Sequence, residues 1–159
     1  MLWPGLLRRQ SVIILPLGGD ELPQVIALLG ANGLPTADLT GEVQFLGVHD
    51  SRGLEGIVGV EPHGTVGLLR SLAVRQDRRG SGLGSALVLE AERLAAGQRI
   101  TTLYLLTTTA QQFFSHRGYA QIPREGAPPE IGATEEFRSI CPSSAAFMRK
   151  TLQAGRVAS

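Results

Sequence analysis

The residues whose types and spacing suit them to chemistry gather in one stretch, residues 78–85, which reads RRGSGLGS. Glycine has no Cβ, so glycines at positions 80, 82 and 84 let the backbone approach a ligand closely. Amide N–H groups at the start of a helix, together with the helix dipole, favour anionic oxygens. Arg75, Arg78 and Arg79 add positive charge nearby. The stretch therefore predicts a phosphate-binding loop.

Two common phosphate motifs do not match it. A dinucleotide fingerprint needs G-x-G-x-x-G between parallel strands, but the third glycine position is Ser85 counted from Gly80, or Leu87 counted from Gly82. A P-loop needs Gly-Lys-Ser/Thr, and the only lysine of the chain is Lys150. A glycine-rich turn that binds nothing remains the alternative on these residues alone.

Such a loop needs a strand before it and a helix after it. Residues 65–74 are the most apolar run and predict a strand. Residues 82–96 predict an amphipathic helix, because Leu83, Leu87 and Ala91 recur at intervals of four. The loop is thus expected between a buried strand and a helix.

Upstream of the loop, the chain predicts an antiparallel meander. Turn residues at 50–53 and 62–64 separate three apolar runs, at residues 43–49, 54–61 and 65–74.

The remaining segments complete one mixed sheet. Further helices are expected at residues 20–29 and 110–117, the second ended by Gly118. The expected helix caps are Asp20 and Thr109, the other expected strands are residues 11–17, 100–106, 119–122 and 146–152, and one helical turn is expected near 134–137. The order β-α-βββ-α-β-α-ββ predicts an α+β domain.

The composition excludes several classes of protein. A chain of 159 residues suits one domain. With 15 basic and 14 acidic side chains, the net charge of +1 gives no electrostatic reason to bind nucleic acid or a membrane surface. One cysteine, Cys141, excludes a disulfide within the chain and a cysteine-rich metal site, so no metal is expected.

The location and the chain ends follow from the same kind of argument. No run approaches the roughly 18 apolar residues of a membrane span, and a cytoplasmic location is expected. We interpret residues 1–10 as a loose leader, residues 11–153 as one domain and residues 154–159 as a disordered tail.

Two motifs resemble those of the GNAT N-acetyltransferase superfamily. Residues 79–84 read RGSGLG and match the family's acyl-CoA signature R/Q-x-x-G-x-G/A. Residues 110–119 read AQQFFSHRGY and are similar to its A-x-x-F-Y-x-x-x-G-F segment, at the family's spacing. Over about residues 12–152 the resemblance implies a GNAT-type fold, with a mixed, mostly antiparallel sheet flanked by helices.

Further segments resemble a subgroup, the small arsenic-resistance N-acetyltransferases. These are residues 33–39 (GLPTADL), 69–74 (LRSLAV), 105–114 (LLTTTAQQFF) and 141–145 (CPSSA). The end of the domain, with Ile122-Pro123 and Lys150-x-Leu152, is also similar to the acetyltransferase domain of N-acetylglutamate synthase. These resemblances imply a small amine substrate with an amino-acid head, a role in arsenic or toxin resistance, and a homodimer, because the last strands of this fold commonly pair across subunits.

The resemblance implies acetyl-CoA as the cosubstrate. Its pyrophosphate would lie on the loop amides, and the main chain of residues 72–74 would pair with its pantetheine arm like an added strand. The thioester would then lie between that strand and residues 100–106. The cofactor-binding residues so implied are Leu72, Ala73, Val74, Arg79, Gly80, Ser81, Gly82, Leu83, Gly84, Ser85, Thr107 and Phe114.

The chain departs from the family at its catalytic positions. Leu68 stands where some members carry a catalytic glutamate, and Phe114 where an acid tyrosine is usual. Deprotonating an alkylamine of pKa ~10.4 at pH 7 costs roughly 4–5 kcal/mol, which a general base would partly supply. Glu61 as base and Tyr119 as acid are the hypotheses; a solvated strand-end carboxylate and a core tyrosine are the alternatives.

Four residues are candidates for the acceptor site. Arg70 and Ser71 precede the segment expected to pair with the cofactor, and Arg70 is expected to clamp an acid group of the acceptor. Thr36 and Asp38 lie in the loop that covers acceptor sites in this fold. Pairing of Arg70 with Glu61 or a cross-strand neighbour is the alternative.

These observations leave two main functions. One is an acetyl-CoA-dependent N-acetyltransferase that acts on a small amine by direct attack. The other is a non-catalytic acyl-CoA-binding or sensing module, which the missing glutamate and tyrosine favour. Acetylation of proteins is a third, and the proline-rich residues 123–144 are expected to block the open groove that it needs.

Overall fold

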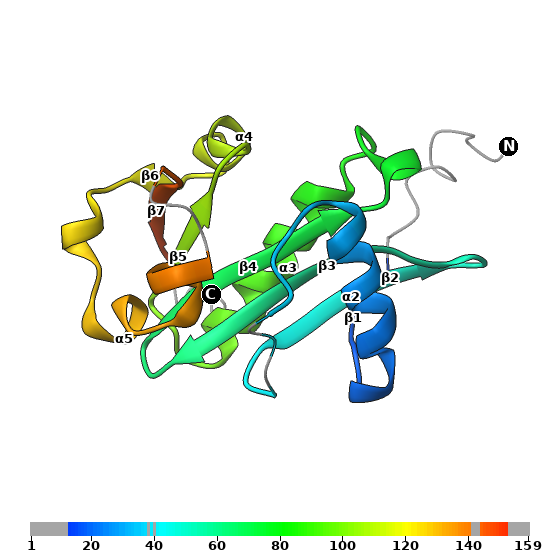
Figure 1. Ribbon diagram of the computed structural model, residues 1–159, viewed down its shortest axis with the longest axis horizontal. Helices are drawn as coiled ribbons and strands as arrows, with labels where there is room; N and C mark the ends of the chain where they lie inside the picture. The colour runs from blue at the N-terminus through cyan, green and yellow to red at the C-terminus, as the bar shows by residue number, and fades with distance from the viewer. Residues whose placement is uncertain (1–12, 38, 40, 141–143, 153–159) are drawn as a thin grey trace, which may run out of the picture.

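Seven strands form one sheet in the computed structural model, which describes residues 13–37, 39, 41–140 and 144–152 (Figure 1). The strand order is β1-β2-β3-β4-β5-β7-β6, and among these strands only β4 and β5 run parallel. The predicted α+β class, with a mixed, mostly antiparallel sheet, is confirmed. The strands are β1 (Leu15–Pro16), β2 (Gln44–Asp50), β3 (Gly53–His63), β4 (Val66–Val74), β5 (Thr102–Thr107), β6 (Ala120–Gln121) and β7 (Ala146–Thr151).

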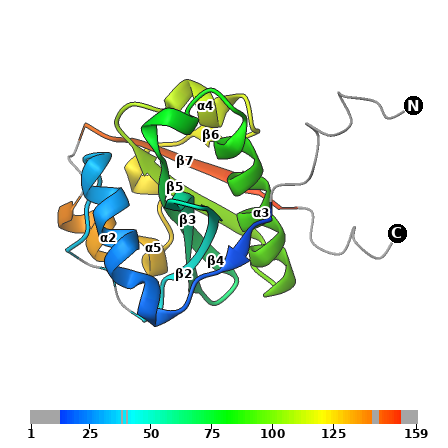
Figure 2. The same cartoon turned by 90° about the vertical axis from the view of Figure 1, so that its right-hand side faces the viewer.

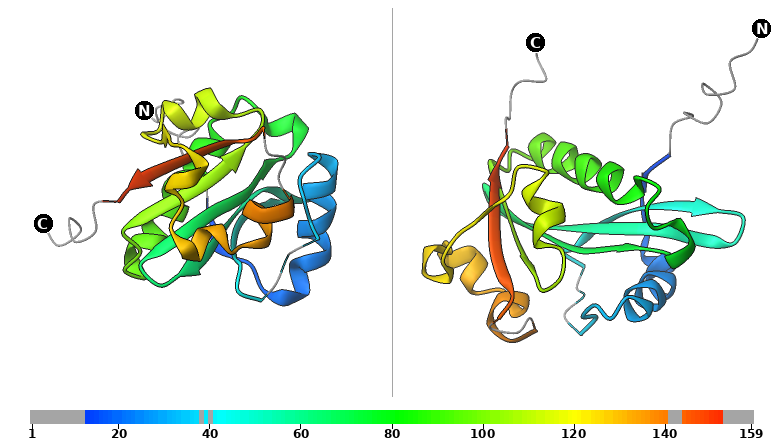
Figure 3. Two further views of the ribbon diagram at one scale, coloured as in Figure 1. Left: turned by 60° about the vertical axis from the view of Figure 1, so that its left-hand side comes forward. Right: turned by 90° about the horizontal axis from the view of Figure 1, so that it is seen from above.

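Helices cover both faces of the sheet. Helix α3 packs on one face, while α2 and the segment 123–140 pack on the other (Figures 2 and 3). The helices are α2 (Leu22–Ala31), α3 (Leu83–Gly97), α4 (Gln111–Ser115) and α5 (Pro129–Gly132), with 3₁₀ turns at Gly19–Glu21, Gln76–Arg78 and Arg124–Gly126 and a π-helical turn at Glu136–Ile140.

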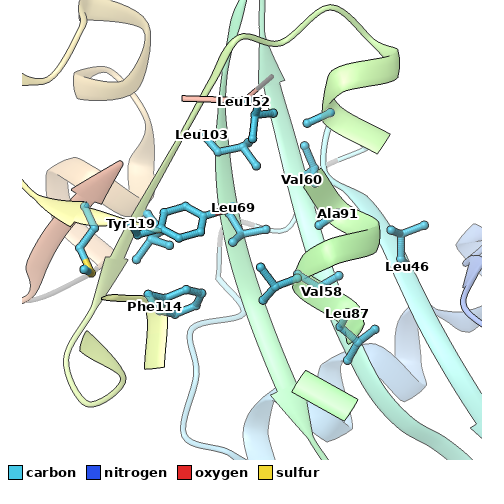
Figure 4. Packing of buried hydrophobic residues seen from close by; sticks show 14 of the residues in the cluster. Leu46, Val58, Val60, Leu69, Leu87, Ala91, Leu103, Phe114, Tyr119 and Leu152 are labelled. Carbon is cyan, nitrogen blue, oxygen red and sulfur yellow. The ribbon is translucent and has the colours of Figure 1, made fainter. Parts of the chain in front are cut away.

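The two faces follow from the alternation of side chains along each strand. On β3, Val58 joins the cluster beneath α3, whereas its neighbour Ile57 joins the cluster beneath α2. The predicted apolar stripe of α3 is buried: Leu87 and Ala91 are fully covered and lie against Val58 (Figure 4). The sheet is therefore a rigid layer from which the loops at its edge project.

The one parallel pair opens the sheet. Strands β4 and β5 are paired only from Val66 to Leu68 and from Thr102 to Tyr104, and then they diverge (Figure 1). A β-bulge interrupts β4 just beyond, because Ser71 and Leu72 together stand opposite Val58. Ser71 has φ 60, a left-handed conformation that re-aims the backbone at this point. The predicted gap between these two strands is thus present.

Several predicted boundaries were wrong. The first strand spans only Leu15–Pro16 in place of residues 11–17, and residues 11 and 12 lie outside the described part. Asp20 caps no helix: α2 starts at Leu22, with proline in its first turn. Thr109 caps nothing either, because the N-cap of α4 is Ala110, whose N–H donates to Thr107 Oγ1 at 2.9 Å.

The segment 123–140 holds more structure than the one turn expected near residues 134–137. Its prolines hide the helical period, but Pro129 starts a short helix, where its missing N–H costs nothing. The expected leader (residues 1–10) and tail (154–159) lie outside the described residues. In the part of the chain that the structure describes, no helix is both long and apolar enough to cross a membrane.

Candidate functional site

A cleft of about 560 Å³ opens beside the amino end of helix α3. It lies between the β4–α3 loop on one side and α4 on the other. Most of the predicted loop residues border it. The lining residues are Asn32, Leu72, Ala73, Val74, Arg78, Arg79, Gly80, Gly82, Gly84, Ser85, Thr109, Ala110, Phe113 and Arg117.

The amino end of α3 presents backbone donors to this cleft. The first amides of a helix have no acceptor within the helix, and here no side chain of the described residues caps them. The N-cap is Gly82, in the left-handed region with φ 87, where any other residue is strained. Gly84 and Ser85 follow in the first turn and line the cleft. The end of α3 is therefore suited to an anion.

Two of the three arginines of the loop are neutralised, contrary to the simple expectation. Arg75 Nη2 donates to Asp50 Oδ2 at 2.5 Å, and Arg75 Nε donates to Asp77 Oδ1 at 2.7 Å. Arg78 Nε donates to Glu55 Oε1 at 2.6 Å. These ion pairs fasten the loop to the β2–β3 hairpin, so the charges of Arg75 and Arg78 serve to hold the loop in place.

The ion pairs of Arg75 lower the pKa values of the two aspartates. Hydrogen bonds from Arg75, followed by those from Arg52, lower the pKa of Asp77 to about 2. The same arginine holds the pKa of Asp50 far below its ordinary range. A carboxylate with a lowered pKa stabilises the fold above its unfolded pKa of about 4, and that contribution is lost as the pH falls through the folded value.

We therefore expect Asp77→Asn to flatten the acid limb of the stability profile. The wild type should lose melting temperature more steeply than the variant between about pH 4 and pH 2, since only the wild type has this carboxylate to protonate. Thermal unfolding followed by circular dichroism at each pH measures the difference. Added salt should shrink it, because Asp77 is 45% exposed. Parallel curves for the two proteins would show that the Asp77 ion pairs do not stabilise the loop.

Two other arginines bring charge to the cleft with neutral partners. Arg79 Nη2 donates to Asn32 Oδ1 at 2.5 Å, at the end of helix α2. Arg117, from the other wall, donates through Nε to Ser85 Oγ at 3.0 Å and through Nη1 to the Phe113 carbonyl at 2.7 Å. Among the described residues, neither has a carboxylate partner, so both keep their positive charge for a ligand.

A smaller cavity of about 120 Å³ continues the site into the gap between β4 and β5. Apolar side chains and three hydroxyls dominate its lining, and the predicted residues Thr107 and Phe114 are among them. The lining residues are Leu34, Leu69, Arg70, Ser71, Leu72, Leu105, Leu106, Thr107, Thr109, Ala110 and Phe114. The bulge at Ser71 therefore lies where the two cavities meet, since Leu72 borders both.

Arg70 borders the small cavity, but its guanidinium is already engaged. Its Nη1 donates to Glu61 Oε1 and its Nη2 pairs with Glu136 Oε1, both at 3.1 Å, and Nε donates to Ser71 Oγ at 3.2 Å. The side chain is fully buried. In this structure Arg70 pairs with Glu61, as the alternative has it, and its expected role as a clamp for an acceptor acid group stays a prediction.

Glu61 does not reach either cavity lining. One carboxylate oxygen accepts from Arg70, and the other lies 2.9 Å from Nε2 of His63. With both oxygens bound, Glu61 is not placed to take a proton from an amine in the gap. Glu61 is instead part of a charge cluster with His63, Arg70 and Glu136, and its role as general base stays an untested hypothesis that this placement does not favour.

Tyr119 is likewise a packing residue. Its ring is buried beside Phe114 in the cluster beneath α3 (Figure 4). Its hydroxyl donates to Glu92 Oε2 at 2.9 Å, and burial followed by the charge of Glu92 raises its pKa far above the ordinary value. It lines neither cavity, so its placement favours the alternative of a core tyrosine, and the hypothesis of an acid stays untested.

The other predicted residues are spread more widely. Leu83 is buried in the core, Ser81 donates to the Arg78 carbonyl at 2.5 Å, and Thr36 borders neither cavity. Asp38, with Cys141, lies outside the described residues. Within the described ranges, no group of three or more metal-ligating side chains comes together.

Sequence reasoning missed the second wall of the cleft. Arg117 follows Phe113 by four residues, and its guanidinium lies 3.7 Å from the centre of that ring. An aromatic residue and a cation four positions apart, at the end of an expected helix, were the available signal. Asn32 carried no such signal, because only the fold brings the end of α2 to the loop.

The family described as Acetyltransferase (GNAT) domain matches residues 41–121, which include the loop, α3 and α4. An uncharacterized N-acetyltransferase of Chlorobaculum tepidum is 35% identical over 63 residues, which is 40% of this chain and 40% of that protein. The match thus covers less than half of this curated relative.

Solved structures share the fold. N-acetylglutamate synthase of Neisseria gonorrhoeae, solved with coenzyme A and L-arginine, has a TM-score of 0.71 at 19% identity and covers 91% of this chain. This chain spans 34% of that protein. A GNAT-family acetyltransferase of Staphylococcus aureus has a TM-score of 0.71 at 16% identity, over 90% of this chain and 100% of its own.

Proposed function

Because the chain belongs to the GNAT acetyltransferase domain family, we propose that it transfers the acetyl group of acetyl-CoA to the amine of a small, amino-acid-like substrate. One observation carries this proposal. The uncapped end of α3 and two arginines with neutral partners border a cleft, and the cleft leads to an apolar gap between β4 and β5. The anion site suits the phosphates of an acyl-CoA, and the apolar gap suits its pantetheine arm and acyl group.

The chain's own groups would hold the cosubstrate as follows. The amides around Gly82 and Gly84, with the Arg79 guanidinium, would bind the pyrophosphate. Backbone groups of β4 from Leu72 to Val74 are available beside the gap, because β5 has diverged from them, and they would pair with the pantetheine arm. Bound there, acetyl-CoA supplies an activated acetyl thioester. The coenzyme A in the Neisseria gonorrhoeae structure supports this assignment.

The described lining of the small cavity favours an amine that loses its proton readily. Its polar side chains are Arg70, Ser71, Thr107 and Thr109, and none of these is a base at neutral pH. Reaching the neutral form at pH 7 costs roughly 5 kcal/mol for a lysine-like amine of pKa ~10.4, but about 1 kcal/mol for the terminal α-amino group of a peptide, of pKa ~8. The α-amine of a free amino acid lies between the two, because its own carboxylate stabilises the ammonium form. We therefore propose an α-amine as the acceptor.

A thiol-release assay tests the function. Purified protein is mixed with acetyl-CoA and single amines, and free coenzyme A is measured against controls without amine and without protein. The panel holds the standard amino acids, phosphinothricin-type and arsenic-bearing amino-acid analogues, short peptides with a free N-terminus and a lysine peptide whose α-amine is blocked. We expect release with one or a few α-amino compounds and none with the blocked lysine peptide.

Two outcomes would contradict the proposal. Turnover confined to the lysine side chain would overturn the α-amine acceptor. Tight binding of acetyl-CoA with no turnover on any amine would instead support the second candidate, an acyl-CoA-binding module, for which the non-basic lining of the gap is the favouring observation. Success with the arsenic-bearing analogues would support a role in arsenic resistance.

A further inference from the structure

We infer that Arg117 binds the 3′-phosphate of the cosubstrate, and so makes the site selective for coenzyme A over forms that lack this group. The inference rests on the proposed function and extends it, because the resemblance to the family implied no role for Arg117. It starts from a charged side chain on the wall of the cleft opposite the loop.

Three contacts fix the Arg117 guanidinium in place. Its Nε donates to Ser85 Oγ at 3.0 Å, with a second, shorter bond from Nη2 to the same oxygen. Its Nη1 donates to the Phe113 carbonyl at 2.7 Å, and its Cζ lies 3.7 Å from the centre of the Phe113 ring. A long cationic side chain normally loses conformational entropy on binding, but this one is already ordered.

The contacts leave donors that match a phosphate. A guanidinium has five N–H groups, and the three hydrogen bonds above use one each on Nε, Nη1 and Nη2. One N–H remains on each terminal nitrogen. Such a pair of donors suits two oxygens of one phosphate group. The lining residues of the cleft include Arg117, so these donors lie at its wall.

Arg117, like Arg79, differs from Arg75 and Arg78 in the charge of its partners. Arg75 and Arg78 are paired with Asp50, Asp77 and Glu55. Arg117 has only neutral partners among the described residues, although it is partly buried. A partly buried charge without a counter-ion is costly, and an anionic ligand would remove that cost. The site therefore lacks one negative group on the α4 side.

The contact between Arg117 and Ser85 also distinguishes the position of the pyrophosphate from that of the 3′-phosphate. Arg117 occupies both lone pairs of the Ser85 hydroxyl, which leaves its O–H as a donor. This donor and the amides of α3 are available to the pyrophosphate, together with Arg79 from the loop. Arg117 lies beyond Ser85, in the turn that follows α4, so it meets a further phosphate. The 3′-phosphate is that group, and it carries up to about two negative charges.

Binding of two ligands to three proteins tests the inference. The ligands are coenzyme A and dephospho-coenzyme A, which lacks only the 3′-phosphate; the proteins are the wild type, Arg117→Gln and the matched control Arg79→Gln. Calorimetry gives each dissociation constant. We expect the wild type to prefer coenzyme A by about 10- to 100-fold, the range for a charged hydrogen-bond pair. Arg117→Gln should lose that preference by weakening coenzyme A alone, whereas Arg79→Gln should weaken both ligands.

Each other outcome overturns the inference in a recognisable way. Equal weakening of both ligands by Arg117→Gln would place the arginine at the pyrophosphate or in a structural role. An unchanged preference would remove it from the site. A wild type that binds neither ligand would overturn the proposed function as well. Arg117→Lys, which keeps the charge, should retain part of the preference, and it replaces Arg117→Gln if that variant does not fold.

Discussion

Arg70→Ala is expected to lower the free energy of unfolding by about 3–5 kcal/mol, the range for removing one partner of a buried ion pair. The Arg70 side chain is fully buried, and those of Glu61 and Glu136 are 12% and 6% exposed. Removal of the arginine would take its guanidinium away from both carboxylates. Because the cluster joins β3, β4 and the π-helical turn, its loss should loosen the segment 123–140 first.

Urea denaturation followed by circular dichroism measures the loss. Arg93→Ala is the control, because the Arg93–Glu90 pair is exposed, at 65% and 36%, and an exposed pair contributes at most about 1 kcal/mol. Arg70→Lys should recover part of the stability, since it keeps the charge but not the forked geometry. A loss below 1 kcal/mol for Arg70→Ala would show that Glu61 and Glu136 protonate or reach water without cost.

A triple variant separates charge from packing. In Arg70→Met, Glu61→Gln and Glu136→Gln combined, no buried charge remains at these three positions. Replacement of a buried ion cluster as a whole is often neutral or stabilising. We expect the triple variant to be more stable than Arg70→Ala alone, and the reverse order would show that the packing of the arginine, rather than its charge, matters.

The local parts of the fold were predictable from the sequence. The period of Leu83, Leu87 and Ala91 located α3, and turn residues located the β2–β3–β4 meander, because both signals depend on neighbours in the chain. The loop was also predictable, because the type and spacing of its glycines can be read directly from the sequence.

The electrostatic partners were not predictable. Glu136 lies 66 residues beyond Arg70, in a segment whose prolines conceal its helical turns. The neutralisation of Arg78 by Glu55 likewise depends on a contact across the sheet. Residue types alone suggest that an arginine near a loop is free for a ligand, and only the fold shows which arginines already have a counter-ion.

Gly84→Val is expected to weaken binding of coenzyme A by at least about 100-fold. A Cβ at position 84 would lie 3.4 Å from Phe113 Cζ, which is ordinary contact, so alanine fits. Valine adds two methyl groups beyond that contact, and the space that they can enter is the cleft bordered by Gly84. They would keep an anion from the amides of α3. Loss of two charge-assisted hydrogen bonds, each about 1.5–3 kcal/mol, accounts for this magnitude.

The matched variants make the result specific to the cleft. Gly84→Ala should bind coenzyme A within about tenfold of the wild type and unfold at a similar temperature or higher, because alanine is the better helix former by up to ~1 kcal/mol. Gly97→Val makes the same exchange at the far end of α3, where nothing lies within 4 Å, and should leave binding unchanged. Calorimetry with coenzyme A compares all three. Undiminished binding by Gly84→Val would mean that the amides of α3 do not contact the ligand, and the anion would then have to be held by Arg79 and Arg117 alone.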